Sequence, residues 1–203
     1  MPSLKILFGP SKNELWKQLS EEIGGQFVDG GFWKGNKVVA KASHWTVTLD
    51  TYTVSTGKTH VTYTRLRAPF CNPDSFRFTI YKKSVFSLLC KRLGMQDIEI
   101  GYPDFDDDFI IQGNNESKLR SLFADSRFRQ LIQDQPDFHL EVKDDEGWFG
   151  TDFPEGVDEL CFQVVGVIKD IALLKALFEL FSVALDDLCR MGSAYTNDPN
   201  VIL

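Results

Sequence analysis

Histidine and cysteine are scarce in this chain of 203 residues, which contains three of the first and four of the second. A zinc site built from Cys and His needs closely spaced ligand pairs, and no C-x-x-C pair is present. The four cysteines are too few for a disulfide-stabilised scaffold, so the composition favours a reducing compartment and predicts a cytoplasmic protein. The cysteines are Cys71, Cys90, Cys161 and Cys189.

Long apolar runs are also missing. The apolar run near the N-terminus covers only residues 6–8, which is too short for a signal peptide, and no stretch reaches the length of a membrane span. We therefore expect no contact with a membrane. Low-complexity tracts, internal repeats and linkers are absent, so we expect residues 1–203 to form a single domain.

Positive charge is deficient, with 22 Lys and Arg against 29 Asp and Glu, a net charge of −7. Nucleic acid requires a basic surface, so we expect no nucleic-acid partner. The charge is uneven. Residues 1–100 contain 14 basic and 8 acidic side chains, a net +6, and residues 101–203 contain 8 and 21, a net −13. This asymmetry indicates that the basic and acidic halves pack against each other or present two unlike faces.

The pattern of apolar residues predicts the elements in turn. Ser11 and Glu14 form a capping box before a helix over about 12–23, and residues 26–28 are typical of a short strand. Alternation over 37–70 predicts an antiparallel meander, followed by a strand over 76–81 and a short helix from Ser84 to Gly94. Further along, we expect two short helices within 116–134 and strands over 138–142 and 160–165.

Residues 171–188 form the most apolar segment, interrupted by a narrow polar stripe. A helix with so wide an apolar surface is buried on most sides, so it is central to the fold or forms half of a dimer. The predicted fold class is α+β: an antiparallel β-meander in the N-terminal half, mixed helices and strands in the C-terminal half, and this long helix packed on the sheet.

Motifs that would carry catalysis are lacking. Gly57-Lys58-Thr59 is similar to part of a phosphate-binding loop, but the glycine required five residues earlier is replaced by Tyr52 and both flanks are strands. We interpret it as a hairpin turn. The histidines, at positions 44, 60 and 139, are isolated in strand-like segments, and no nucleophile elbow is present. We therefore predict no catalytic residue and no cofactor.

Clustered aspartates offer the chief candidates for a metal site. They occur in the segment 104–108 and in the loop 144–158, whose length is typical of a functional or mobile loop. Hard cations bind several converging oxygens, but the spacing does not match an EF-hand, and a structural turn is the alternative for residues 104–108. The candidate ligands are Asp104, Asp106, Asp108, Asp144 and Asp145.

Basic side chains interleave with aromatic ones in the first half, and this pattern leaves open an anionic ligand or surface. The alternative is an ordinary solvated face. The basic residues are Arg65, Arg67, Arg77, Lys82, Lys83, Lys91 and Arg92.

Three short motifs resemble an uncharacterised family of bacterial proteins, a domain of unknown function. They are Trp16-x-x-Leu19 with Gly24-Gly25, the segment 63–69, and Gly101-x-x-x-Phe105-Asp106-x-x-Phe109-x-Ile111-x-Gly113. The resemblance covers most of residues 12–135. It implies a bacterial source and carries no catalytic residue over to this chain.

These observations favour a non-catalytic binding or protein-interaction module of the bacterial cytoplasm over an enzyme. A homodimer, through a sheet edge or the last helix, and a protein partner are left open. The alternatives are a metal-dependent or acid/base hydrolase using the aspartates of 104–108 or the loop 144–158, and binding to an anionic surface by the basic half.

Overall fold

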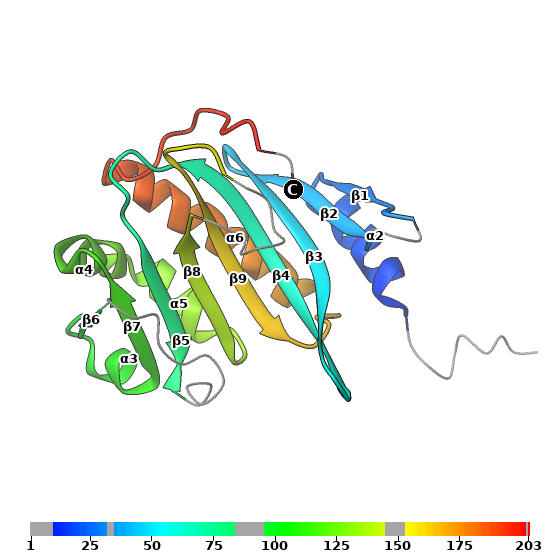
Figure 1. Cartoon of the computed structure of the whole chain (residues 1–203), viewed down its shortest axis with the longest axis horizontal. Helices are drawn as coiled ribbons and strands as arrows, with labels where there is room; N and C mark the ends of the chain where they lie inside the picture. The colour runs from blue at the N-terminus through cyan, green and yellow to red at the C-terminus, as the bar shows by residue number, and fades with distance from the viewer. Residues whose placement is uncertain (1–9, 32–34, 84–95, 145–152, 202) are drawn as a thin grey trace, which may run out of the picture.

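A single antiparallel sheet runs through the computed structural model, which describes residues 10–31, 35–83, 96–144, 153–201 and 203. Within these residues nine strands pair in the order β1-β2-β3-β4-β9-β8-β5-β7-β6 (Figure 1). The strands are β1 (Gln26–Val28), β2 (Lys37–Ala42), β3 (Trp45–Thr56), β4 (Thr59–Cys71), β5 (Phe78–Lys82), β6 (Gln96–Asp97), β7 (Phe109–Gly113), β8 (Phe138–Lys143) and β9 (Val157–Val165).

Helices cover one face of the sheet. The longest, α6, crosses behind the strands in Figure 1 and contacts α2, α4, α5, β2 and β3. The indole N–H of Trp16 on α2 donates to the carbonyl oxygen of Ile168, which ties the first helix to the turn before α6. The described helices are α2 (Lys12–Glu22), α3 (Pro103–Asp108), α4 (Glu116–Ala124), α5 (Ser126–Gln133) and α6 (Ile171–Arg190).

The strand register separates an apolar face from a polar one. Leu49, Leu66, Phe162, Leu140 and Ile80 lie side by side across five strands, and all are fully buried on the helix-covered face. Because side chains alternate along a strand, the neighbouring positions point to the opposite face. There the cross-strand rows consist mostly of polar and charged side chains.

Most predicted elements are confirmed, and the fold is α+β. The capping box of Ser11 and Glu14 begins α2, Gly57 forms the β3–β4 hairpin turn with a positive φ, and two short helices occupy 116–133. The strand predicted over 76–81 begins at Phe78 instead. The helix predicted from Ser84 to Gly94 lies outside the described residues.

Residues 103–108, which include the aspartate segment, form the helix α3 and not the structural turn that the sequence suggested. Pro103 occupies the first turn, where its missing N–H costs no hydrogen bond and its fixed φ suits a helix. Phe105 faces inward and stacks on Phe109 with ring centroids 4.3 Å apart. This contact anchors the helix against the sheet.

The apolar surface of α6 is buried inside the chain. Leu174, Leu177, Leu180, Phe181 and Leu185 are all inaccessible to solvent. Only four residues of this helix are exposed, at positions 172, 175, 179 and 190. The helix is therefore a core element, and a dimer stays a prediction.

Both halves of the chain contribute strands to the sheet, with β9 and β8 inserted between β4 and β5. Arg77 in the basic half donates from Nε to Asp158 in the acidic half at 3.1 Å, and Arg67 lies 4.0 Å from Glu159. Opposite charges of the two halves thus meet directly. Among the described helices, none is long and apolar enough to cross a membrane.

Candidate functional site

The polar face of the sheet contains a network of charged side chains. Asp50 on β3 accepts from Arg65 on β4 through two hydrogen bonds, Nε to Oδ1 at 3.0 Å and Nη2 to Oδ2 at 2.9 Å. Arg67, two residues further along β4 and on the same face, donates from Nη2 to the same carboxylate at 2.5 Å. One aspartate on β3 therefore holds two guanidinium groups of the adjacent strand β4.

The network continues to a fully buried glutamate. Glu159 on β9 lies 4.0 Å from Arg67 Nη1 and 3.6 Å from Lys143 Nζ on β8, measured from its carboxylate oxygens. Its side chain has no solvent exposure. A buried carboxylate needs paired positive charge, and these two contacts supply it. This part of the polar face is a structural ion network.

A chain of hydrogen bonds without arginine, lysine or carboxylate side chains follows along the same face. The Tyr52 hydroxyl donates to Gln163 Oε1, and Gln163 Nε2 lies 3.0 Å from His139 Nδ1. Burial, with a smaller effect of the neighbouring Cys161, raises the pKa of Tyr52 to about 12. Burial likewise raises the pKa of the Cys161 thiol. A buried, protonated thiol is a poor nucleophile, so this arrangement does not favour thiol chemistry.

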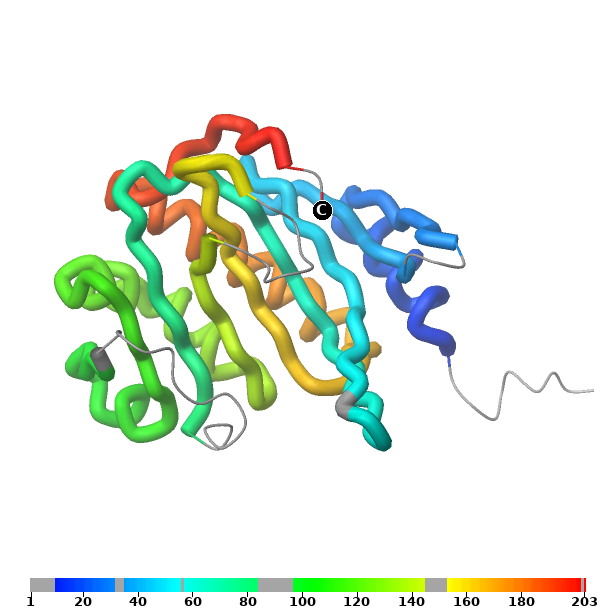
Figure 2. Tube along the Cα trace, viewed as in Figure 1, coloured from blue at the N-terminus to red at the C-terminus, as the bar shows by residue number. Residues whose placement is uncertain are grey.

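A cavity of about 450 Å³ lies at one end of the polar face, between β2 and β3 and the chain that follows α6. This C-terminal tail (residues 195–201 and 203) begins where the Tyr195 N–H donates to the Cys71 carbonyl oxygen at 3.0 Å. It then runs back along that end of the sheet towards β2 and β3 (Figure 2). We call this cavity the tail pocket. Its lining is Lys37, Val39, Lys41, His44, Trp45, Thr46, Thr48, Pro69, Thr196, Asn197, Asp198, Pro199, Asn200, Val201 and Leu203.

The register explains which groups form the floor of the tail pocket. Val39 pairs with Thr48 and Lys41 with Thr46, so these side chains share the polar face of the sheet. Thr48 also lies opposite Arg67 on β4, which joins the floor of the pocket to the ion network. The pocket is therefore an extension of the polar face that the tail covers.

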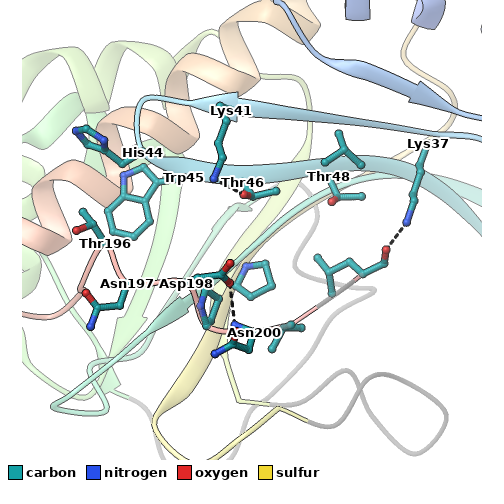
Figure 3. Close-up of a pocket in the computed structure, with 15 residues that line it drawn as sticks. Lys37, Lys41, His44, Trp45, Thr46, Thr48, Thr196, Asn197, Asp198 and Asn200 are labelled. Atoms are coloured by element: carbon teal, nitrogen blue, oxygen red, sulfur yellow. Dashed lines mark hydrogen bonds between the residues drawn. The ribbon is translucent and has the colours of Figure 1, made fainter.

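The polar groups of the tail pocket make few strong interactions with each other (Figure 3). Lys41 Nζ donates to Thr46 Oγ1 at 2.8 Å, and Lys37 Nζ donates to the Leu203 backbone oxygen. On the tail, the Asn200 N–H donates to Asp198 Oδ1 at 2.8 Å. Neither lysine forms an ion pair with a side-chain carboxylate of the described residues.

A second cavity, of about 460 Å³, lies beside β6, β7 and α3. Acidic side chains dominate its polar lining, which includes Asp97, Glu99, Asp106 and Glu116. Within the described ranges, however, no three Asp, Glu, His or Cys side chains converge as metal ligands would. This cavity offers less defined chemistry than the tail pocket.

The candidate metal ligands are dispersed. Asp106 accepts three hydrogen bonds from backbone N–H groups, and Asp144 pairs with Arg77 Nη1 at 2.7 Å. Asp104 and Asp108 are exposed, and Asp145 lies outside the described residues. The structure thus brings no three of the described candidates together, and a metal site there stays a prediction.

The basic side chains of the first half make individual contacts rather than one open surface. Arg77 joins Asp144 to Asp158, and this interaction with Asp158 raises the pKa of the guanidinium. Lys82 and Lys83 donate to the backbone oxygens of Gln135 and Asp106, at 2.9 Å in each case. Lys91 and Arg92 lie outside the described residues.

Sequence reasoning missed the tail pocket. The tail has no periodicity, and its meeting with β2 depends on the whole path of the chain. One signal was available, because Lys37, Val39 and Lys41 alternate with Val38 and Ala40. This alternation places two lysines on the same face of one strand.

No family model matches this chain, and no curated protein matches it in sequence. In fold, it is similar to a solved structure. The match is the crystal structure of the mycobacterial trehalose monomycolate transport factor A, TtfA, with a TM-score of 0.51 at 11% sequence identity. The alignment covers 87% of this chain and 94% of that one. At this identity the similarity establishes the fold alone. These findings are consistent with the loose resemblance to an uncharacterised family.

Proposed function

We propose that this chain is a non-catalytic binding module of the bacterial cytoplasm, and that the tail pocket is its binding site. The observation that carries the proposal is the cavity of about 450 Å³ between the polar face and the tail. Its size falls within the range typical of small-molecule sites. Its lining places six apolar residues beside nine polar or charged ones, so it offers both apolar contact and hydrogen-bonding groups.

The surrounding chemistry supports binding rather than turnover. Beyond the floor of the pocket, Asp50, Arg67 and Glu159 are engaged in ion pairs that hold the sheet together. The similar solved structure is named as a transport factor, which is compatible with a binding role for this fold. The free thiols of Cys71, Cys161 and Cys189 support a reducing compartment.

Amide chemical-shift mapping with a library of small fragments tests this proposal on the full chain. We expect the bound fragments to shift the amide resonances of Val39, Thr46, Thr48 and the tail residues 196–200. Deletion of residues 196–203 removes one wall of the pocket, so it should abolish binding while the unfolding transition of the sheet persists. Fragments that bind only beside β6 and β7, or binding unchanged by the deletion, would contradict the assignment.

A further inference from the structure

We infer that the tail pocket accepts an amphipathic anion: a small molecule with a carboxylate, sulfonate or phosphate group on an apolar body. This inference rests on the proposed function, because it names the ligand class of the same site. It follows from the placement of two lysines, the partly apolar surface beside them, and the tail that covers both.

The two lysines supply the positive charge. Lys37 and Lys41 lie on the same face of β2, four residues apart, which corresponds to about 13 Å along an extended strand. Their described hydrogen-bond partners are a backbone oxygen and a threonine hydroxyl. Each ammonium group has three donors, so an anion that reaches either one forms an ion pair in addition to these contacts.

The surface beside the lysines is partly apolar. Val39 separates them on the pocket floor, and Pro69, Pro199 and Val201 also line the cavity. A small hydrated anion such as phosphate gains nothing from these groups. A ligand with an apolar body buries its own surface against them while its charged group reaches a lysine.

The acidic groups near the pocket do not reverse this preference. Among the described lining residues, Asp198 is the one with a side-chain carboxylate, and one of its oxygens already accepts the Asn200 N–H. His44, in the turn between β2 and β3, is exposed and adds a further donor at the end nearer Lys41. The described lining side chains thus include two lysines and one partly engaged carboxylate.

The covering tail favours a small molecule over a membrane surface. Residues 196–201 and Leu203 line one side of the pocket, and the Leu203 backbone oxygen accepts from Lys37 Nζ. A bilayer is too large to enter a cavity enclosed on this side. Val39 is therefore accessible to a free ligand of limited size and not to lipid headgroups in a membrane.

Isothermal titration calorimetry with a matched set of probes tests the inference on the full chain. The probes are octanoate, 1-octanol, octyltrimethylammonium and inorganic phosphate, which separate the apolar body from the charge. We expect octanoate to bind at least about tenfold more tightly than octanol, a difference that one charge-assisted bond can supply. The octyl cation and phosphate should show no binding.

Charge-removing variants locate the contact. K37M and K41M keep most of the apolar stem, and the double variant should weaken octanoate binding about tenfold or more without changing octanol binding. The control K58M removes the same charge at the exposed tip of the β3–β4 hairpin and should bind octanoate like the parent chain. K37Q and K41Q repeat the test if the methionine variants do not fold, as judged by circular dichroism.

Different results would contradict the proposed binding site and the proposed preference for an anion. Equal binding of octanol and octanoate would overturn the anionic preference and leave the pocket as a binding site. The anionic preference would also be overturned if K58M weakened octanoate binding as much as the double variant does. Retention on anionic vesicles without binding of free octanoate would overturn it as well. If neither the probes nor the fragments shift the amide resonances of Val39 and Thr48, both proposals fail.

Discussion

Replacing Asp106 by alanine distinguishes a structural role for this side chain from a role in metal binding. Asp106 Oδ1 accepts the Ile100 N–H at 2.9 Å, and Oδ2 accepts the N–H groups of Gly101 and Tyr102 at 2.9 and 3.0 Å. The carboxylate thus satisfies three consecutive donors of the segment that enters α3. Asp107 on the same helix is exposed and serves as the matched control.

The expected cost follows from this geometry. A hydrogen bond to a charged group contributes about 1.5–3 kcal/mol when it is buried. Here the three bonds share one half-buried carboxylate and two of them are exposed, so we expect D106A to lose about 2 kcal/mol in total. For a chain of this length, that loss lowers Tm by about 4–8 °C. D107A should change the free energy of unfolding by less than about 0.5 kcal/mol.

Thermal unfolding followed by circular dichroism, with and without EDTA, measures both quantities. The hydrogen-bond explanation requires the same difference between D106A and D107A in chelator and in excess Ca²⁺ or Mg²⁺. A D106A melting temperature equal to that of D107A would refute the reasoning. A difference that disappears in EDTA would show that Asp106 acts through a bound cation, as its sequence context suggested.

Three further predictions concern the charged and apolar interior. Because the folded state holds the pKa of Tyr52 near 12, stability should fall from about pH 10 to pH 12 as the unfolded tyrosine ionises, and Y52F should flatten this fall in chemical denaturation. Burial alone would raise the pKa of Asp74, but Lys118, the Ser193 hydroxyl and a backbone N–H lower it below its ordinary value near 3.8. Stability contributed by Asp74 is therefore present above pH 4 and lost as the pH falls below it, and D74N should show a smaller acid loss. Phe162 is fully buried and stacks on a neighbouring phenylalanine at 5.3 Å, so F162A should lower the free energy of unfolding by about 3–5 kcal/mol; a loss below 1 kcal/mol would contradict its place in the core.

Local patterns predicted most of the elements because the relevant signals lie close together in the sequence. Ser11 and Glu14 are three residues apart, and each satisfies a backbone donor of the other. The apolar run of α6 needs no knowledge of its partners to indicate a buried helix. The turn predicted for 104–108 was wrong because an exposed aspartate run carries no helical periodicity, while Pro103 and the buried Phe105 fix the helix through contacts beyond the segment.

The sheet order and the tail pocket could not be predicted in this way. Val157–Val165 pairs with Thr59–Cys71 across almost a hundred residues, and nothing within either segment identifies the other as its partner. The lysines of β2 were visible in the sequence, but their neighbours in the tail are more than 150 residues distant. The opposite net charges of the two halves indicated that ion pairs would form between them. They did not show that Glu159 would be the buried residue on which those ion pairs converge.

The insertion of β9 and β8 between β4 and β5 has a consequence for synthesis on the ribosome. When β4 and β5 have left the exit tunnel, the positions beside them remain empty until residues 138–165 follow. During that interval the edge of β4 exposes unpaired backbone groups, which can pair with the wrong strand or with another chain. Long-range pairing of this kind is slow to form. Translation speed across residues 72–165 therefore sets how long the nascent chain is vulnerable to aggregation.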